Sequence, residues 1–316
     1  MTVSPAGSSA RSGSGLRSGL ALIRKPEGIT SFQALAPLKR RLGSGKVGHA
    51  GTLDRFASGL IVALAENYSR LASYVQRGEK RYRGLVAFGK ETATLDPEGE
   101  TIATAPPPSL AELESALPQF RGPIMQKPPA YSAVHVDGKR AYELARKGAE
   151  PGLKERPVEI FSLKLVSYEA GSALLDVRCS SGTYIRALAR DLALACDSRA
   201  HLAALERLSI GPYSLGDAVS PEDFDPDRDL RAFSAADASG LGLRTLELRE
   251  PRDAARFALG GRIPAGAFRP LDGGADPIGA DSAVFGSSGS LLGLARLEAG
   301  GIAYLMVMAG EGKGAA

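Results

Sequence analysis

Residues 48–60 read GHAGTLDRFASGL, and this stretch holds one carboxylate, Asp54, in a turn built from small residues. A basic, glycine-rich segment precedes the turn, and an apolar run from Leu60 to Leu64 follows it. Such a turn would place a single charge where a substrate can reach it. The alternative is a helix N-cap, because an Asp side chain readily accepts hydrogen bonds from the free backbone N–H groups of a first helical turn. The rest of the chain has to decide between the two.

The composition is typical of a globular protein. The chain has 316 residues, of which 44% are hydrophobic and 23% are charged, enough for one large core or two unequal ones. No uninterrupted apolar stretch reaches the roughly 18 residues of a membrane-spanning helix, so we expect no membrane association. The N-terminus is rich in Ser, Gly and Arg, and we expect a flexible tail over residues 1–18.

Cysteines and histidines are too few and too scattered for a metal site. The chain has two cysteines, Cys179 and Cys196, and three histidines, without a CxxC or HxxxH pair. We therefore expect no metal and no cofactor, and a reducing compartment, the cytoplasm. Any chemistry must then come from carboxylates, hydroxyls or bases that packing holds in place.

Basic and acidic residues are unevenly distributed along the chain. Residues 1–50 hold eight Lys or Arg and one acid, whereas residues 211–316 hold ten Lys or Arg and fifteen acids. A basic front half around the Asp54 turn would attract a polyanion. The alternative is a solvated face of a basic helix. The residues that predict a phosphate-contacting edge are Lys39, Arg40, Arg41 and Lys46.

Hydrophobic periodicity predicts an α+β fold with a mixed sheet. Apolar residues at helical spacing predict helices over 31–42, 63–75, 110–117, 142–147 and 184–195. Alternating runs predict strands over 20–23, 81–88, 157–168 and 172–180. The prolines of residues 126–133 keep that segment extended.

The composition and the hydrophobic pattern of the chain change after residue 215. Residues 216–240 are acidic and predict a linker. Beyond them, short alternating runs separated by Gly and Pro predict a small β-rich domain over residues 241–312. The main domain is therefore expected over residues 19–215.

Four motifs resemble those of the bacterial tRNA pseudouridine synthases of the TruB type, and they occur in the same order as in that family. They are GHAGTLDRFASGL at 48–60, KRY at 80–82, QKPPAYSA at 126–133 and CSSGTYIRALARDL at 179–192. The resemblance covers residues 20–215 and implies a pseudouridine synthase catalytic domain with a mixed, mainly antiparallel sheet there. It also implies an RNA-gripping insertion over residues 122–150 and a PUA-like fold for the β-rich C-terminal domain.

The resemblance also implies roles for particular residues. Asp54 corresponds to the catalytic aspartate, Tyr82 to an aromatic that packs against the extracted base, and Arg186 to an arginine that holds the carboxylate ionised and aimed. Without the resemblance, Arg186 would be read as a structural ion pair and Tyr82 as a core aromatic. The implied substrate is the uridine at position 55 of the tRNA T loop, which has to leave the base stack before Asp54 can reach it.

Further residues match positions that surround this site in the family. His49 would stack in the space that the uridine vacates, and Tyr184 and Leu208 would border the pocket. The residues expected to contact the RNA backbone of the T stem-loop are Lys25, Arg40, Lys46, Lys139 and Arg146. Nothing in the sequence demands more than a monomer.

Isomerisation of uridine breaks the N1–C1′ bond and rejoins the sugar to C5. One positioned carboxylate suffices, through attack on C1′, attack on C6 or removal of the C2′ proton, and the sequence leaves all three routes open. Two other functions remain alternatives. One is an RNA-binding or tRNA-folding protein with incidental or no catalysis, and the other is a guide-RNA-dependent synthase.

Overall fold

The computed structural model describes residues 18–132, 134–136, 138–145, 148, 152–273, 278–299 and 301–308. The tail expected over residues 1–18 falls outside this part except for Ser18, and so does Arg146, one of the expected RNA contacts. The side chain of Lys139, another expected contact, lies outside it as well. None of the helices in the described ranges has the length and apolar character that a bilayer crossing requires.

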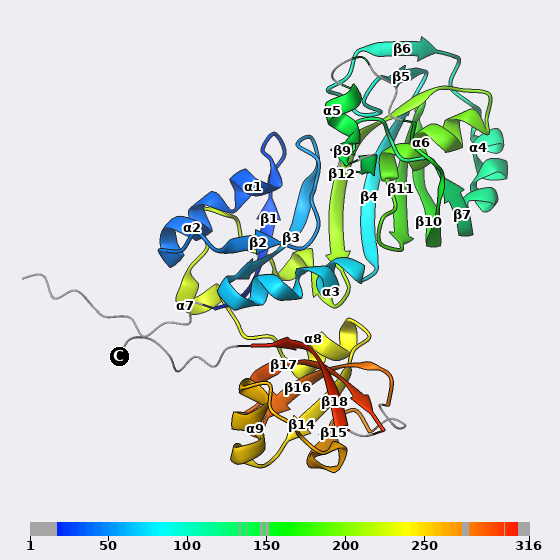
Figure 1. The fold of residues 1–316 in the computed structure, drawn as a ribbon. Coiled ribbons are helices and arrows are strands. Elements are labelled where there is room, and N and C mark those ends of the chain that lie inside the picture. The colour runs from blue at the N-terminus through cyan, green and yellow to red at the C-terminus, as the bar shows by residue number, and fades with distance from the viewer. Residues whose placement is uncertain are drawn as a thin grey trace, which may run out of the picture.

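A mixed sheet forms the centre of the larger part of the molecule (Figure 1). Within the described residues its nine strands are β1 (Gly19–Lys25), β2 (Val47–His49), β3 (Ser58–Ala65), β4 (Lys80–Phe88), β7 (Gly122–Gln126), β10 (Arg156–Glu169), β11 (Ser172–Cys179), β12 (Ala200–Ile210) and β13 (Tyr213–Ser214). The path across the sheet runs β1-β3-β12-β4-β11-β10-β7, with β2 added to β3 and β13 to β12. Neighbouring strands are antiparallel except β3 and β12, which are parallel. The expected α+β class and mainly antiparallel sheet are confirmed.

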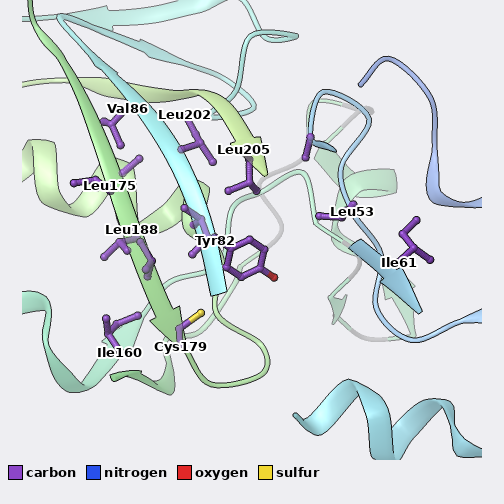
Figure 2. Close-up of a cluster of buried hydrophobic side chains, with 14 of the residues drawn as sticks. Leu53, Ile61, Tyr82, Val86, Ile160, Leu175, Cys179, Leu188, Leu202 and Leu205 are labelled. Carbon is purple, nitrogen blue, oxygen red and sulfur yellow. The ribbon is translucent and has the colours of Figure 1, made fainter. Parts of the chain in front are cut away.

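Helices close one face of this sheet. The helix α6 (Ile185–Leu194) lies against β12 and β4, beside α4 (Leu110–Ala116) and the 3₁₀ turn η2 (Leu117–Phe120). Figure 2 shows Leu188 of α6 packed among Leu175 of β11 and Leu202 of β12, all of them buried. The apolar face of α6 therefore fixes the position of the residues at its N-terminus.

The helix predicted over residues 31–42 is two helices, α1 (Ser31–Ala34) and α2 (Ala36–Leu42). A capping box between Thr30 and Gln33 begins α1. Pro37 lies in the first turn of α2, where its missing N–H costs nothing, but in one continuous helix it would remove a hydrogen bond. The proline therefore explains the division.

The prediction of a helix over residues 63–75 was wrong for the first of these residues. The strand β3 continues to Ala65, and a 3₁₀ turn η1 (Glu66–Leu71) and the short helix α3 (Ala72–Arg77) follow. The apolar run at the end of β3 is almost completely buried, with Val62 and Leu64 at 0% exposure. A buried strand of this length has no alternation to distinguish it from a helix.

The chain between β4 and β10 adds two hairpins and a short helix. They are β5 (Lys90–Thr92) with β6 (Thr101–Thr104), β8 (His135–Val136) with β9 (Lys139–Arg140), and α5 (Ala141–Ala145). The second hairpin and α5 belong to the insertion expected over residues 122–150, and α5 takes the place of the helix predicted over 142–147.

Residues 216–240, expected to be a linker, run along β1. The backbone N–H of Leu20 donates to Arg231 O at 2.8 Å, and that of Arg231 donates to Leu20 O at 2.9 Å. The segment contains the 3₁₀ turn η3 (Leu215–Asp217), α7 (Pro226–Asp229) and α8 (Ala235–Gly240). Phe224 and Phe233 are fully buried. The segment therefore packs as part of the larger body while leading to the next one.

A second, smaller sheet follows, with the path β15-β14-β16-β17-β18. Its elements are β14 (Arg244–Leu248), α9 (Pro251–Ala258), the 3₁₀ turn η4 (Ala265–Ala267), β15 (Phe268–Pro270), β16 (Asp281–Gly286), β17 (Leu291–Glu298) and β18 (Gly301–Val307). Phe285, Leu294 and Met306 share a buried cluster with Tyr68 and Leu71 of η1. The expected β-rich C-terminal unit is confirmed, and it packs on the larger body (Figure 1).

Candidate active site

A cavity of about 720 Å³ opens where the loop between β2 and β3 faces β4, β12 and the start of α6. Segments far apart in the sequence meet here, because the order of strands brings β4 and β12 together in the middle of the sheet. The charged and aromatic side chains that matter for chemistry at its wall are Asp54, Tyr82, Asp96, Tyr184, Arg186 and Arg207.

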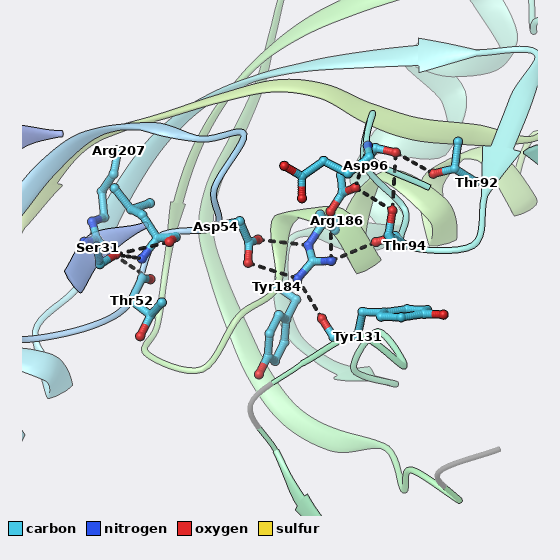
Figure 3. A network of polar contacts seen from close by, with 12 residues as sticks. Ser31, Thr52, Asp54, Thr92, Thr94, Asp96, Tyr131, Tyr184, Arg186 and Arg207 are labelled. Carbon is cyan, nitrogen blue, oxygen red and sulfur yellow. Dashed lines mark hydrogen bonds and ion pairs between the residues drawn. The ribbon is translucent and has the colours of Figure 1, made fainter. Parts of the chain in front are cut away.

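Arg186 is the centre of the polar contacts at this cavity (Figure 3). Its Nε lies 2.9 Å from Asp54 Oδ2, and its Nη2 donates to Asp54 Oδ1 at 3.2 Å. Its Nη1 donates to Asp96 Oδ2 at 3.1 Å and to the Thr94 carbonyl at 2.7 Å. A further bond runs from Nη2 to the Tyr131 carbonyl at 3.0 Å. The guanidinium is thus held by four residues, and its Nε and Nη2 atoms face Asp54.

Asp96 is a second carboxylate on the same arginine, which the sequence interpretation did not select. Its side chain is 6% exposed, against 39% for Asp54. It accepts from Thr94 Oγ1 at 2.5 Å and from the backbone N–H of Glu98 at 3.0 Å. The protein therefore occupies the oxygens of Asp96 and leaves Asp54 facing the cavity. The one sequence signal was the Asp-Pro-Glu-Gly turn that begins at Asp96.

The environment of Asp54 changes its titration. Burial raises the pKa of its carboxyl above the ordinary value, and Arg186 opposes this rise. Asp96 adds to the rise, whereas Lys25 opposes it more weakly. A reaction that needs Asp54 ionised is therefore lost as the pH falls through a pKa above the usual aspartate range.

Two buried side chains hold the Asp54 loop from behind. Ser31 Oγ donates to the Leu53 carbonyl at 3.1 Å and accepts from the Leu53 N–H at 2.8 Å. Lys25 Nζ donates to the carbonyls of Ala57 at 2.5 Å and Arg55 at 3.3 Å. The backbone on both sides of Asp54 is therefore fixed before any substrate arrives.

The expectation that Lys25 contacts the RNA backbone was wrong. The residue is at 0% exposure, and its ammonium group is satisfied by backbone carbonyls, Pro26 O among them at 2.9 Å. Burial lowers its pKa to about 8, although the nearby Asp54 opposes this fall. A basic residue beside a turn does not reveal, from sequence, whether its head group turns outward or into the protein.

Replacing Lys25 with Met should destabilise the fold and slow the reaction. The change leaves buried carbonyls of the Asp54 loop without a donor, at a cost of about 2–3 kcal/mol in the free energy of unfolding. Denaturant unfolding measures this loss. Lys46→Met, a change at an exposed position, should alter stability by less than about 0.5 kcal/mol. A Lys25→Met variant as stable as the unaltered protein would show that these contacts are incidental.

Tyr82 and Tyr184 both line the cavity. Tyr82 is 8% exposed, and Figure 2 shows its ring reaching from β4 toward Leu53 of the Asp54 loop. Tyr184 immediately precedes α6, where Gln126 clamps its backbone by donating to its carbonyl at 3.2 Å and accepting from its N–H at 2.8 Å. The guanidinium of Arg156 lies 4.9 Å from the centre of the Tyr184 ring. Gln126 and Arg156 are register partners on β7 and β10, and the sequence offered no sign of either role.

Leu208 does not border the cavity. Leu205 and Arg207 line it instead, because side chains alternate along β12 and these two share a face. Leu208 is half-buried and packs against the apolar cluster formed by residues such as Leu60 and Val62. The expectation for Leu208 was therefore wrong in this structure.

His49 lies on β2, just before the Asp54 loop, and is half-buried outside the wall of the cavity. Burial lowers its pKa below the ordinary value, with Arg207 adding to the fall, and its Nδ1 is buried without a partner among the described residues. Arg40 and Lys46 are both exposed. Lys139 lies on β9 of the insertion.

A family model and the sequences of known proteins match this chain to the same kind of enzyme. Residues 39–185 match the model of the TruB family pseudouridylate synthase (N terminal domain). A tRNA pseudouridine synthase B from Borreliella burgdorferi is 41% identical over 211 residues, which are 66% of this chain and 75% of that protein. Another tRNA pseudouridine synthase B, from Corynebacterium jeikeium, is 40% identical over 225 residues, 68% of this chain and 73% of that protein.

Solved structures share the fold over nearly the whole chain. A chain in the crystal structure of a Cbf5-Nop10-Gar1 complex superposes with a TM-score of 0.69 at 20% identity, covering 92% of this chain and 84% of that one. A chain in the structure of an H/ACA RNP bound to a substrate RNA containing 2′-deoxyuridine has the same TM-score at 18% identity, covering 92% and 85%. At these identities the likeness concerns the fold alone.

Proposed function

This chain belongs to the TruB family of pseudouridylate synthases, and we propose that it isomerises the uridine at position 55 of the tRNA T loop with Asp54 as its one catalytic carboxylate. The family itself makes the chain an isomerase that converts uridine into pseudouridine in tRNA. The position in the T loop and the identity of the catalytic residue are the finer parts of the proposal.

The observation that carries the proposal is the ion pair between Asp54 and Arg186 at the wall of the cavity. Both carboxylate oxygens of Asp54 lie against one edge of the guanidinium, at 2.9 and 3.2 Å. Arg186 therefore favours the ionised carboxylate and limits its rotation. Lone pairs of both oxygens remain for a substrate, because the Asp54 side chain is still 39% exposed.

Asp96, the second carboxylate on Arg186, is not available as a second catalytic group. Asp96 balances the second edge of Arg186 but is closed off by its own hydrogen bonds. Asp54 then acts as nucleophile at C1′ or C6, or as the base that removes the C2′ proton. In each route the carboxylate must be ionised and placed within bonding distance of the sugar or base.

The cavity suits a single nucleotide that has left its stack. The rings of Tyr82 and Tyr184 are both available at its lining, and Tyr82 is almost completely buried. A uridine in a folded loop reaches such a site only by rotating out of the stack, and the energy for this step comes from contacts to the flanking backbone. Exposed Arg40 and Lys46 on one side, and Lys139 in the insertion on the other, are the residues proposed to supply them.

The protein is proposed to act as a monomer in the cytoplasm. Both cysteines, Cys179 and Cys196, are free, which fits a reducing compartment.

Mapping pseudouridine in a tRNA transcript after incubation with the purified protein and no cofactor tests the proposal. A carbodiimide-based assay should find one pseudouridine, at position 55, and none in a transcript with cytidine at that position. A protein that binds the transcript but leaves it unmodified would support an RNA-binding or RNA-folding role instead. Modification at another uridine would contradict the proposed position.

A further inference from the structure

The main sheet is joined in the middle by very few backbone contacts. The strand β12 runs antiparallel to β4 over most of its length, but its parallel pairing with β3 covers only Glu206↔Ser58 and Arg207↔Gly59. Asp54 lies on the β3 side of this joint, whereas Tyr82 and Arg186 lie on the other side. The relative position of the catalytic groups therefore depends on how this joint is held.

Glycine is required at the joint because the two strands approach very closely. Gly59 has a φ of +112°, and a Cβ there would lie 2.4 Å from the Arg207 carbonyl oxygen and 2.5 Å from the Arg207 N. Both values are far below van der Waals contact. The backbone of Arg207 is thus pressed against the chain immediately after the Asp54 loop.

The side chain of Arg207 reaches back across the same joint. Its Nε donates to the Leu60 carbonyl at 2.8 Å, and its Nη2 donates to the Gly51 carbonyl at 3.0 Å. A longer contact of 3.4 Å runs from Nη1 to the Thr52 carbonyl. One rigid guanidinium therefore connects the chain before Asp54 with the chain after it.

The same guanidinium lies beside Tyr82. Arg207 and Tyr82 are register partners on β12 and β4, and both line the cavity. Arg207 is 2% exposed, and among the described residues it forms no ion pair with a carboxylate. A charge buried without a carboxylate partner is costly, so its retention calls for a reason beyond packing.

The charge of Arg207 also acts on Asp54. Burial lowers the pKa of Arg207, and the charge of Asp54 opposes this fall. By reciprocity the guanidinium favours the ionised form of Asp54. It does so in addition to Arg186, which holds the carboxylate from the other side of the cavity.

We propose that Arg207 is a positioning residue for the isomerisation: it fixes the Asp54 loop against Tyr82 across the β3–β12 joint. The inference rests on the proposed function of Asp54. Arg207 has no need to touch the substrate, since its donors are directed to the carbonyls of Gly51, Thr52 and Leu60. It acts through the loop and through its charge.

Two variants separate these two contributions. Arg207→Met removes the charge and the donors at similar volume, and Arg207→Lys keeps the charge but loses the planar fork. The measurements are the single-turnover rate of pseudouridine formation in tRNA at saturating protein, its pH profile, and tRNA affinity. Arg231→Met is the matched control, because Arg231 pairs with the buried Asp237 in the segment along β1, away from the cavity.

The pH profile is the readout that a structural role would not move. The charged and titratable groups that bear on Asp54 are Arg186 from α6, Asp96 from the turn after β5, Lys25 from β1, Tyr82 from β4 and Arg207 from β12. Removing one cation from this set makes ionisation of Asp54 less favourable. The acid limb of the rate must then move to higher pH.

We expect the single-turnover rate of Arg207→Met to fall about 100-fold, as a misplacement of about 1 Å would cause. Its acid limb should move to higher pH, with tRNA affinity within about threefold. Arg207→Lys should lose about tenfold in rate, with an unmoved acid limb. Arg231→Met should lower stability and leave both rate and profile unchanged.

An unchanged rate and profile in folded Arg207→Met would overturn the inference. If that variant does not fold, a normal single-turnover rate in Arg207→Lys overturns it instead. The unaltered protein is assayed on the same tRNA alongside. If the unaltered protein forms no pseudouridine, the result counts against the proposed function. If the unaltered protein is active and the Arg207 variants have the same rate and pH profile, the result counts against this inference alone.

Discussion

Replacing Asp54 with Asn is expected to abolish pseudouridine formation while tRNA affinity stays within about threefold. The amide keeps the size of the side chain but carries no charge and is a poor nucleophile and base. We expect the single-turnover rate to fall by at least about 10⁴-fold, the loss that follows removal of a group on which the whole reaction depends. Binding should survive because the expected backbone contacts lie elsewhere on the surface.

Asp176→Asn is the control for this change. Asp176 accepts from Arg81 Nε at 3.0 Å and Nη2 at 2.9 Å, so it is also an aspartate paired with an arginine. It lies on β11 with its side chain on the face of the sheet opposite Val177, away from the cavity. The Asp176→Asn rate should remain within about threefold. Normal turnover by Asp54→Asn would refute the proposed catalytic residue.

Periodicity predicted the parts of the fold whose pattern is local. The alternation of residues 81–88, 157–168 and 172–180 predicted β4, β10 and β11, and the helical spacing over 184–195 predicted α6. These elements have one face on the core and the other in a more polar setting, which is what produces a readable period. The strand β3 has no such contrast, because both its faces are covered, and its end was mistaken for a helix.

Two features of the sheet depend on contacts that no local pattern reveals. The strand β12 was not among the predicted strands, although it joins the two parts of the sheet. Its residues alternate poorly because register shifts interrupt its pairing with β4 at Leu202/Ala204 and Arg207/Ser209. The parallel joint with β3 follows from the tertiary arrangement alone.

The motifs predicted Asp54, Tyr82, Tyr184 and Arg186, and the structure brings all four to one cavity. Their roles in the reaction stay predictions until the variants are measured. Asp96 escaped notice because its partner Arg186 lies 90 residues away in sequence. Lys25 was misread for a related reason: its burial depends on the fold, since the carbonyls of Arg55 and Ala57 that it binds lie far along the chain.

Replacing Arg186 with Lys should slow the reaction strongly, although less than the loss of Asp54. An ammonium group cannot meet Asp54, Asp96 and the carbonyls of Thr94 and Tyr131 at once, because it lacks the planar fork that the guanidinium supplies. Asp54 and the buried Asp96 would then face each other with their shared counter-charge displaced. Breaking a buried pair costs about 3–5 kcal/mol. If most of this energy is lost from the transition state as well, the rate falls by about 10²–10⁴-fold.

The loss should appear in the single-turnover rate at saturating protein rather than in tRNA affinity, since Arg186 is 4% exposed and its donors serve the protein. Arg190→Lys makes the same substitution one turn later on α6, where Arg190 pairs with Asp191 and donates to the Lys127 carbonyl. That variant should stay within about threefold of the unaltered rate. Equal losses in the two variants would mean that α6 merely tolerates no lysine. A large loss confined to Arg186→Lys would mean that the guanidinium shared by the two carboxylates is required. It binds Asp96, whose oxygens are occupied by the protein, and Asp54, which stays accessible from the cavity, and this difference makes Asp54 the reactive carboxylate.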